Sequence, residues 1–164
     1  MFFIRVLVIA MLAPLAAGAL ASAAEKNQIP DDLKTILEKA DKFELLSLEP
    51  EHLKEKPADG FHGWKVLGRT TVKDAETRKT LLAAFEKGVE ENKGEVARCF
   101  DPRHGIRATH GDKTVELVIC FECYQVKAFA GEGALKGFLV TGSPQPAFDK
   151  VLTDAKVPLA KKRK

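Results

Sequence analysis

The stretch "CFDPRHGIRATHGDKTVELVICFEC", residues 99–123, contains all three cysteines of the 164-residue chain and two of its four histidines. Its middle, "HGDK" at residues 110–113, has the composition of a tight hairpin turn, and β-type residues lie on both sides of it. We therefore expect two antiparallel strands that meet at Gly111. Folding the stretch about this glycine places Cys99 opposite Cys123, so the three sulfurs are expected to lie close together.

Three segments outside the hairpin have helical patterns. The first begins near Asp31 or Asp32, either of which can act as its cap, and its apolar residues recur at i, i+3, i+4 and i+7. The second has Asp74 as its cap and ends before Gly94. A third, shorter helix is expected over residues 145–155. The predicted buried faces of the first two are Leu33, Ile36, Leu37 and Ala40, and Leu81, Leu82, Phe85 and Val89.

The remaining segments read as extended chain. They are residues 43–50, where Pro50 stops the strand, 61–72, 95–100, 105–110, 134–142 and a long run at 113–129, "KTVELVICFECYQVKAF". Helices at both ends and in the middle can cover one face of the sheet that these strands form. The order predicts one α+β domain over residues 24–160, with an antiparallel sheet of about four to five strands and two to three helices packed mainly on one face.

The first residues of the chain resemble a secretory signal. Residues 1–23 have Arg5 near the start, then an apolar run, then small residues before Ala24. Pro14 and Gly18 interrupt the run, which is short for a bilayer span. We expect a signal peptide at 1–23, a protein exported to the periplasm or secreted, and no stable membrane span after cleavage.

The positive charge of the chain lies at its ends. There are 26 Lys and Arg against 23 Asp and Glu, and the basic count falls to 21 without Arg5 and the tail at residues 161–164. A short basic tail is typical of a disordered end, and nucleic-acid binding needs a basic face on the fold itself. We therefore expect no nucleic-acid partner. The charge distribution does not exclude a protein partner.

The residues before the first hairpin strand are expected to form a bulge. In "DPRHG", residues 101–105, Asp-Pro starts a tight turn, Pro102 has no N–H to donate, and the glycine tolerates positive φ. A bulge here would direct Arg103 and His104 toward the cysteines. On a regular strand, however, Cys120 and Cys123 would have Cα atoms about 10 Å apart, whereas a disulfide needs about 4.4–6.8 Å.

One hypothesis for this cluster is a metal site. Cys99 and His104 have Cys-x₄-His spacing, and Cys120 and Cys123 have Cys-x₂-Cys spacing. Three thiolates and one imidazole form a Cys₃His set that suits zinc or another thiophilic metal. The sequence therefore makes these four residues candidate metal ligands.

Other chemistry competes for the same residues. In an oxidising compartment, a disulfide of Cys99 with Cys120 or Cys123 would staple the hairpin and leave one odd thiol. A redox-active thiol is a third hypothesis, in which the positive charges of Arg98, Arg103, Arg107 and a protonated His104 favour a thiolate. A hydrolytic cysteine paired with histidine is a fourth, but no recognisable oxyanion loop accompanies it.

Four segments carry a resemblance to a protein family. "FHGWKVLG", "CFDPRHGIR", "VICFEC" and "SPQPAFDKVL" resemble motifs of an uncharacterised family of small exported planctomycete-type bacterial proteins. The resemblance covers about residues 61–158, and its CF-x-PRHGIR and ICFEC motifs are the most specific part. It implies export and one contiguous domain, and it implies no activity, cofactor or catalytic residue.

These observations give one functional hypothesis and one alternative. The hypothesis is a small exported domain whose β-hairpin carries a Cys/His cluster that binds a thiophilic metal or reacts through a thiol. The alternative is a non-enzymatic envelope or interaction module stapled by one disulfide. The sequence favours a role other than enzyme, because no paired catalytic groups or phosphate-binding loop are found.

Overall fold

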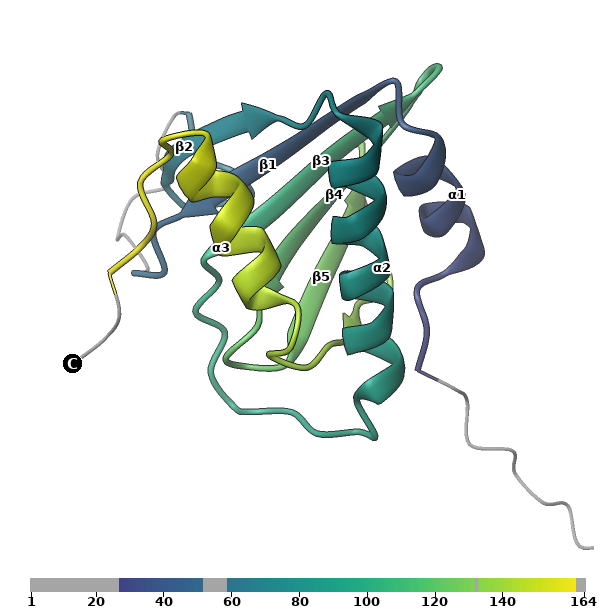
Figure 1. Ribbon diagram of the computed structural model, residues 1–164. Helices are drawn as coiled ribbons and strands as arrows, with labels where there is room; N and C mark the ends of the chain where they lie inside the picture. The colour runs from purple at the N-terminus through teal and green to yellow at the C-terminus, as the bar shows by residue number, and fades with distance from the viewer. Residues whose placement is uncertain (1–26, 52–58, 132, 162–164) are drawn as a thin grey trace, which may run out of the picture.

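The computed structural model describes residues 27–51, 59–131 and 133–161. It contains an antiparallel sheet with helices on one face, as expected, so the fold is α+β (Figure 1). The predicted signal peptide and nearly all of the basic tail lie outside the described residues. Within the described part of the chain, none of the helices has the length and apolar character needed to span a bilayer.

The helices are α1 (Asp31–Lys39), α2 (Ala75–Glu91) and α3 (Gln145–Asp154). The predicted cap of α1 is wrong, because Pro30 occupies the cap position and both aspartates lie in the first turn. The predicted cap of α2 is confirmed, since Asp74 accepts a 2.7 Å hydrogen bond from the Thr77 N–H. The predicted apolar faces of α1 and α2 are all buried.

The strands are β1 (Lys42–Leu48), β2 (Val66–Thr71), β3 (His104–His110), β4 (Lys113–Cys120), β5 (Gln125–Ala130), β6 (Gly133–Ala134) and β7 (Phe138–Leu139). Within the described residues the order is β2-β1-β3-β4-β5-β6, and β7 also pairs with β5. The strand count exceeds the expected four to five, because the predicted strands at 113–129 and 134–142 are each broken in two. Residues 95–100 form no strand.

The hairpin of β3 and β4 forms as expected. His110 pairs with Lys113 across the two-residue turn, and His104 pairs with Ile119 at the other end. Gly111 has φ +59, which an L side chain rarely adopts and which a tight hairpin turn requires. The composition of residues 110–113 was therefore sufficient to predict the turn. The observed pairing is shifted by one residue from the expected register, which placed Cys99 opposite Cys123.

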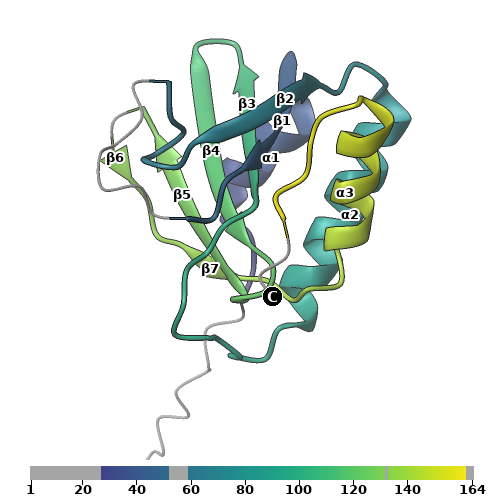
Figure 2. The same cartoon turned by 90° about the vertical axis from the view of Figure 1, so that its left-hand side faces the viewer.

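Alternation along the strands divides the side chains between two faces. On one face, which we call the helix face, Phe43, Leu45, Ile106 and Leu117 join the core with the three helices. On the opposite face, which we call the open face, Leu46, Leu48 and Val118 pack with Phe61 and Trp64. In Figure 2, α2 and α3 lie to one side of the sheet.

The segment between α2 and β3 connects the two faces. It leaves α2 on the helix side, passes the end of the sheet and enters β3 from the open side (Figure 2). Phe100 in this segment packs on the open-face cluster, and its ring lies 5.5 Å from the ring of Trp64. Cys99 is therefore carried to the end of β4, where the other two cysteines lie.

The cysteine cluster as candidate functional site

The disulfide of this protein joins Cys120 to Cys123. β4 ends at Cys120, residues 121–124 form a turn, and Tyr124 has φ +60. The turn brings the two Cα atoms to 5.1 Å, within the range that a disulfide requires. The expected pairing of Cys99 with one of them is therefore corrected, because it assumed that one strand continued through both positions.

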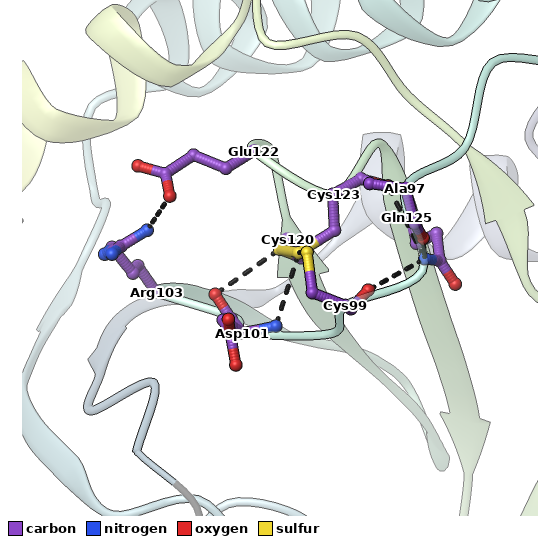
Figure 3. Close-up of a disulfide and its surroundings, with 8 residues drawn as sticks. All are labelled: Ala97, Cys99, Asp101, Arg103, Cys120, Glu122, Cys123 and Gln125. Atoms are coloured by element: carbon purple, nitrogen blue, oxygen red, sulfur yellow. Dashed lines mark hydrogen bonds and ion pairs between the residues drawn. A yellow bond between two sulfur atoms is a disulfide. The ribbon is translucent and has the colours of Figure 1, made fainter. Parts of the chain in front are cut away.

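Cys99 carries a free, exposed thiol beside this bond (Figure 3). Its Sγ lies 3.2 Å from the Sγ of Cys123, although 24 positions separate the two residues. The Gln125 side-chain amide donates hydrogen bonds to the carbonyl oxygens of Ala97 (2.7 Å) and Cys99 (3.1 Å). The Ala97 N–H donates to the Cys123 carbonyl oxygen at 3.1 Å. The sulfurs thus come together as the hairpin predicted.

The three cysteine residues differ in their access to solvent. Cys120 and Cys123 are 1% and 0% exposed, whereas Cys99 is exposed. An incoming thiol can therefore reach Cys99 directly, and the protein shields the disulfide itself. Exchange needs a thiolate to contact a disulfide sulfur.

The backbone of Asp101 contacts both sulfurs of the disulfide (Figure 3). Its N–H donates to the Sγ of Cys123 at 3.3 Å, and its carbonyl oxygen lies 3.3 Å from the Sγ of Cys120. The N–H favours negative charge on Cys123, whereas the carbonyl oxygen can accept a hydrogen bond from Cys120 once that sulfur carries a proton. The two ends of the bond are therefore electrostatically different.

His104 does not join the cysteines. Its Nε2 lies 2.8 Å from the Asp149 Oδ1 of α3, and its ring packs against Phe121 and Phe148. The alternation of a strand explains this, because Arg103 and Gly105 face the open side and His104 therefore faces the helices. The predicted Cys₃His set is not assembled. With the Cys120–Cys123 bond formed, no group of three or more His, Cys, Asp or Glu side chains across residues 27–51, 59–131 and 133–161 is arranged to hold a metal.

Two of the arginines that were expected to lie near the cysteines form ion pairs in different parts of the structure. Arg103 is buried and forms an ion pair with Glu122, the residue between Phe121 and Cys123 in the turn (Figure 3). Arg107 instead binds Glu116, with a 2.5 Å contact from its Nε, and lies opposite it in the hairpin. Glu116 lies four positions from Cys120 along β4, which is about 13 Å. Only Arg103 therefore belongs to the surroundings of the disulfide.

The sequence did not predict a second polar cluster on the open face. His62 has φ +51 in the turn between Phe61 and Trp64, and its Nε2 lies 2.7 Å from the Oε2 of Glu116. Its ring stacks on Phe129 with centroids 3.6 Å apart. The dipeptide His-Gly between two aromatic residues was the available signal, because positive φ at both positions makes a tight turn.

The geometry of the cysteine cluster is that of a thiol poised beside a disulfide. The sulfur of an exposed cysteine contacts one end of a buried bond, and a backbone N–H contacts the same end. This arrangement supports thiol–disulfide exchange within one chain. Comparison with protein-family models, with curated protein sequences and with solved structures finds no match for this chain.

Proposed function

We propose that this protein is an exported thiol–disulfide exchange module in which Cys99 relays exchange between an external dithiol and the buried Cys120–Cys123 bond. The observation that carries the proposal is the 3.2 Å contact between the Sγ of Cys99, an exposed residue, and the Sγ of buried Cys123. The shielding of the other two sulfurs supports it, because it leaves Cys99 as the accessible entry point.

The first step is internal. The Cys99 thiolate attacks the Sγ of Cys123, a Cys99–Cys123 bond forms, and the Cys120–Cys123 bond breaks. The electron pair of the broken bond leaves on Cys120, which takes up the proton that Cys99 lost. The Asp101 carbonyl oxygen, 3.3 Å from this sulfur, then accepts a hydrogen bond from the new thiol. The exchange converts a buried bond into one with an exposed end.

The second step involves the partner. A thiolate of an external dithiol attacks the Sγ of Cys99, and Cys123 leaves as a thiolate that the Asp101 N–H stabilises. The second thiol of the dithiol then attacks its own mixed disulfide and releases Cys99. The dithiol is oxidised to a disulfide, the Cys120–Cys123 bond is reduced, and two protons pass to the protein. The same steps run in reverse with a disulfide partner.

Export is the second part of the proposal. The apolar run and small residues at 1–23 support it, and a structural or exchangeable disulfide persists in oxidising compartments outside the cytosol. Expression of the full chain followed by fractionation and N-terminal sequencing tests this part. We expect a mature protein that begins near Ala24 and is found outside the cytosol. An uncleaved chain in the cytosol would contradict export.

The relay is tested by the rate at which a small dithiol reduces the folded protein. We expect Cys99→Ser to slow reduction of the Cys120–Cys123 bond by dithiothreitol at least tenfold. Val96→Ser is the matched control, because it places a serine at a 57% exposed position in the same segment. Alkylation and mass mapping at timed intervals measure the reduction, and we expect a Cys99–Cys123 species to accumulate in the native protein.

An equal reduction rate in Cys99→Ser and in the native protein would contradict the relay. In that case the Cys120–Cys123 bond would act as a staple of the β4–β5 turn. A non-enzymatic envelope or interaction module would then be the better description. The Val96→Ser control separates a loss of the sulfur from a general disturbance of the segment.

A further inference from the structure

We infer that reduction of the Cys120–Cys123 bond creates a three-thiolate site for a soft divalent cation, formed by Cys99, Cys120 and Cys123. The inference rests on the proposed function in one respect, namely that the folded protein allows this bond to be reduced. It differs from the four-ligand site expected from the sequence, because His104 lies on the helix face and takes no part.

One sulfur-to-sulfur distance and one Cα-to-Cα distance favour such a site. Zinc-to-sulfur bonds of about 2.3 Å place the sulfurs of a tetrahedral site about 3.8 Å apart. The Cys99 and Cys123 sulfurs are already 3.2 Å apart, so each needs to move only a few tenths of an ångström. Cys120 and Cys123 occupy the two ends of a turn with Cα atoms 5.1 Å apart. A Cys-x₂-Cys turn is a common half of a structural zinc site.

The surroundings favour thiolate ligands. The Asp101 N–H donates to the Cys123 sulfur at 3.3 Å, and such a hydrogen bond offsets thiolate charge and orients the ligand. The Gln125 amide fixes the backbone on both sides of Arg98 through the carbonyl oxygens of Ala97 and Cys99. Three sulfurs select thiophilic ions over calcium or magnesium, which prefer oxygen. The exposed side of Cys99 leaves a fourth position for water or another ligand.

The redox state controls this site. In the oxidised protein, two of the three sulfurs are bonded to each other and only Cys99 can supply a thiolate. Reduction by an external dithiol transfers two electrons to the bond, oxidises the dithiol and provides two more thiol groups. A bound cation is then coordinated by the Cys99 sulfur, which is no longer free to start disulfide exchange. Cation binding and disulfide exchange therefore exclude each other.

Titration of the reduced protein with Cd²⁺ tests the inference. The protein is reduced with a phosphine, freed of the reductant without air, and monitored by thiolate-to-metal absorption in the ultraviolet and by native mass. We expect one Cd²⁺ per chain in the reduced protein and no comparable absorption in the oxidised protein. Each of Cys99→Ser, Cys120→Ser and Cys123→Ser should weaken binding at least tenfold, whereas Val96→Ser and His104→Gln should not.

Two results would overturn the inference. One is a reduced, folded protein that binds no Cd²⁺, and the other is binding that survives Cys99→Ser at full strength. Circular dichroism of every variant identifies those that fold. Loss of binding in a folded His104→Gln variant would overturn the three-sulfur set. Disulfide mapping of the same samples separates the exchange relay from the cation site. If the Cys120–Cys123 bond is reduced through Cys99 but the reduced protein binds no Cd²⁺, only the cation site is contradicted.

Discussion

Cys99 and Cys123 are 24 positions apart in the chain, yet their sulfur atoms are 3.2 Å apart at the end of the β3–β4 hairpin. The contact depends on the turn at Gly111, on the segment that crosses the end of the sheet, and on the Gln125 amide that holds this segment. Cys123 is also bonded to Cys120. The Cys123 sulfur is therefore bonded to one cysteine sulfur and in contact with another, and the proposed exchange starts from this contact.

The loop closed by the disulfide is longer when Cys123 is bonded to Cys99 than when it is bonded to Cys120. In Cys120→Ser, oxidation should join Cys99 to Cys123, whereas Cys99→Ser keeps the bond across three positions. The longer loop restricts the unfolded chain more, and the loop-entropy relation gives a difference of about 1.5 kcal/mol in free energy of unfolding, in favour of Cys120→Ser. Urea denaturation of both oxidised variants measures it.

The reduced forms of the same two variants serve as controls for that comparison. They should show no such difference, because neither closes a loop. If Cys120→Ser kept two free thiols after oxidation, the two sulfurs would not be neighbours in the folded protein.

The ion pair of Arg103 and Glu122 should stabilise the disulfide turn. Arg103 is buried while the Glu122 side chain is 50% exposed, so Glu122→Gln leaves a buried cation with no partner charge from the turn. We expect the free energy of unfolding to fall by about 1–2 kcal/mol, less than for a fully buried pair.

Chemical denaturation measures this fall, with Glu95→Gln as the exposed control, which should change stability by less than about 0.5 kcal/mol. The double variant Arg103→Met/Glu122→Gln should recover part of the loss, because it also removes the buried charge. A loss in the double variant as large as in Glu122→Gln would argue against the ion pair as the cause.

Gly105 should be intolerant of a side chain. A Cβ at this position would lie 2.8 Å from the Cε1 of Phe61, whose ring is buried on the open face. We expect Gly105→Ala to lower the free energy of unfolding by about 1–3 kcal/mol through overpacking. Thermal or chemical denaturation measures it against Gly142→Ala, where the nearest atom would be 3.7 Å away.

The double variant Gly105→Ala/Phe61→Leu isolates the contact between these two residues. Its loss of stability should be smaller than the sum of the two single losses, because the smaller side chain makes room for the new methyl group. Additive losses would show that Phe61 is not the obstacle.

The cap of α2 should make stability depend on pH in the acid range. Hydrogen bonds from the Thr77 side chain and from its backbone N–H hold the pKa of Asp74 below its usual value of 3.8. A lowered pKa in the folded state means that the contribution is fully present above 3.8 and is lost as the pH falls below that value.

Asp74→Asn isolates this effect, because asparagine caps a helix about as well but does not titrate. The free energy of unfolding of the native protein should fall more steeply below pH 3.8 than that of the variant, and urea denaturation across the acid range measures both. Parallel curves for the two proteins would contradict the assignment.

Local patterns were sufficient to predict the helices and the first hairpin. The buried faces of α1 and α2 follow from the helical period, and the turn at Gly111 follows from the residues that tolerate positive φ. The break between β4 and β5 was missed. "VICFECYQV" contains apolar and β-branched residues throughout, and nothing in its composition marks a turn.

Phe121 and Tyr124 explain why that break lies where it does. Phe121 packs against Phe148 of α3, with ring centroids 5.1 Å apart, and Tyr124 takes positive φ. The Phe121 contact depends on a helix more than twenty residues further along the chain, so no local window could contain it. This turn also brings Cys120 and Cys123 close enough to form the disulfide.

The sequence by itself determined the α+β class, the amphipathic helix faces, the position of the hairpin turn and the gathering of the sulfurs at one end of the sheet, because periodicity and turn chemistry are local properties. Only the tertiary structure decided that Cys120 bonds Cys123, that Cys99 stays exposed beside them, and that His104 faces Asp149 on α3. The physical reason is that the face on which a strand residue lies changes with each position, so a site depends on where each strand begins and ends.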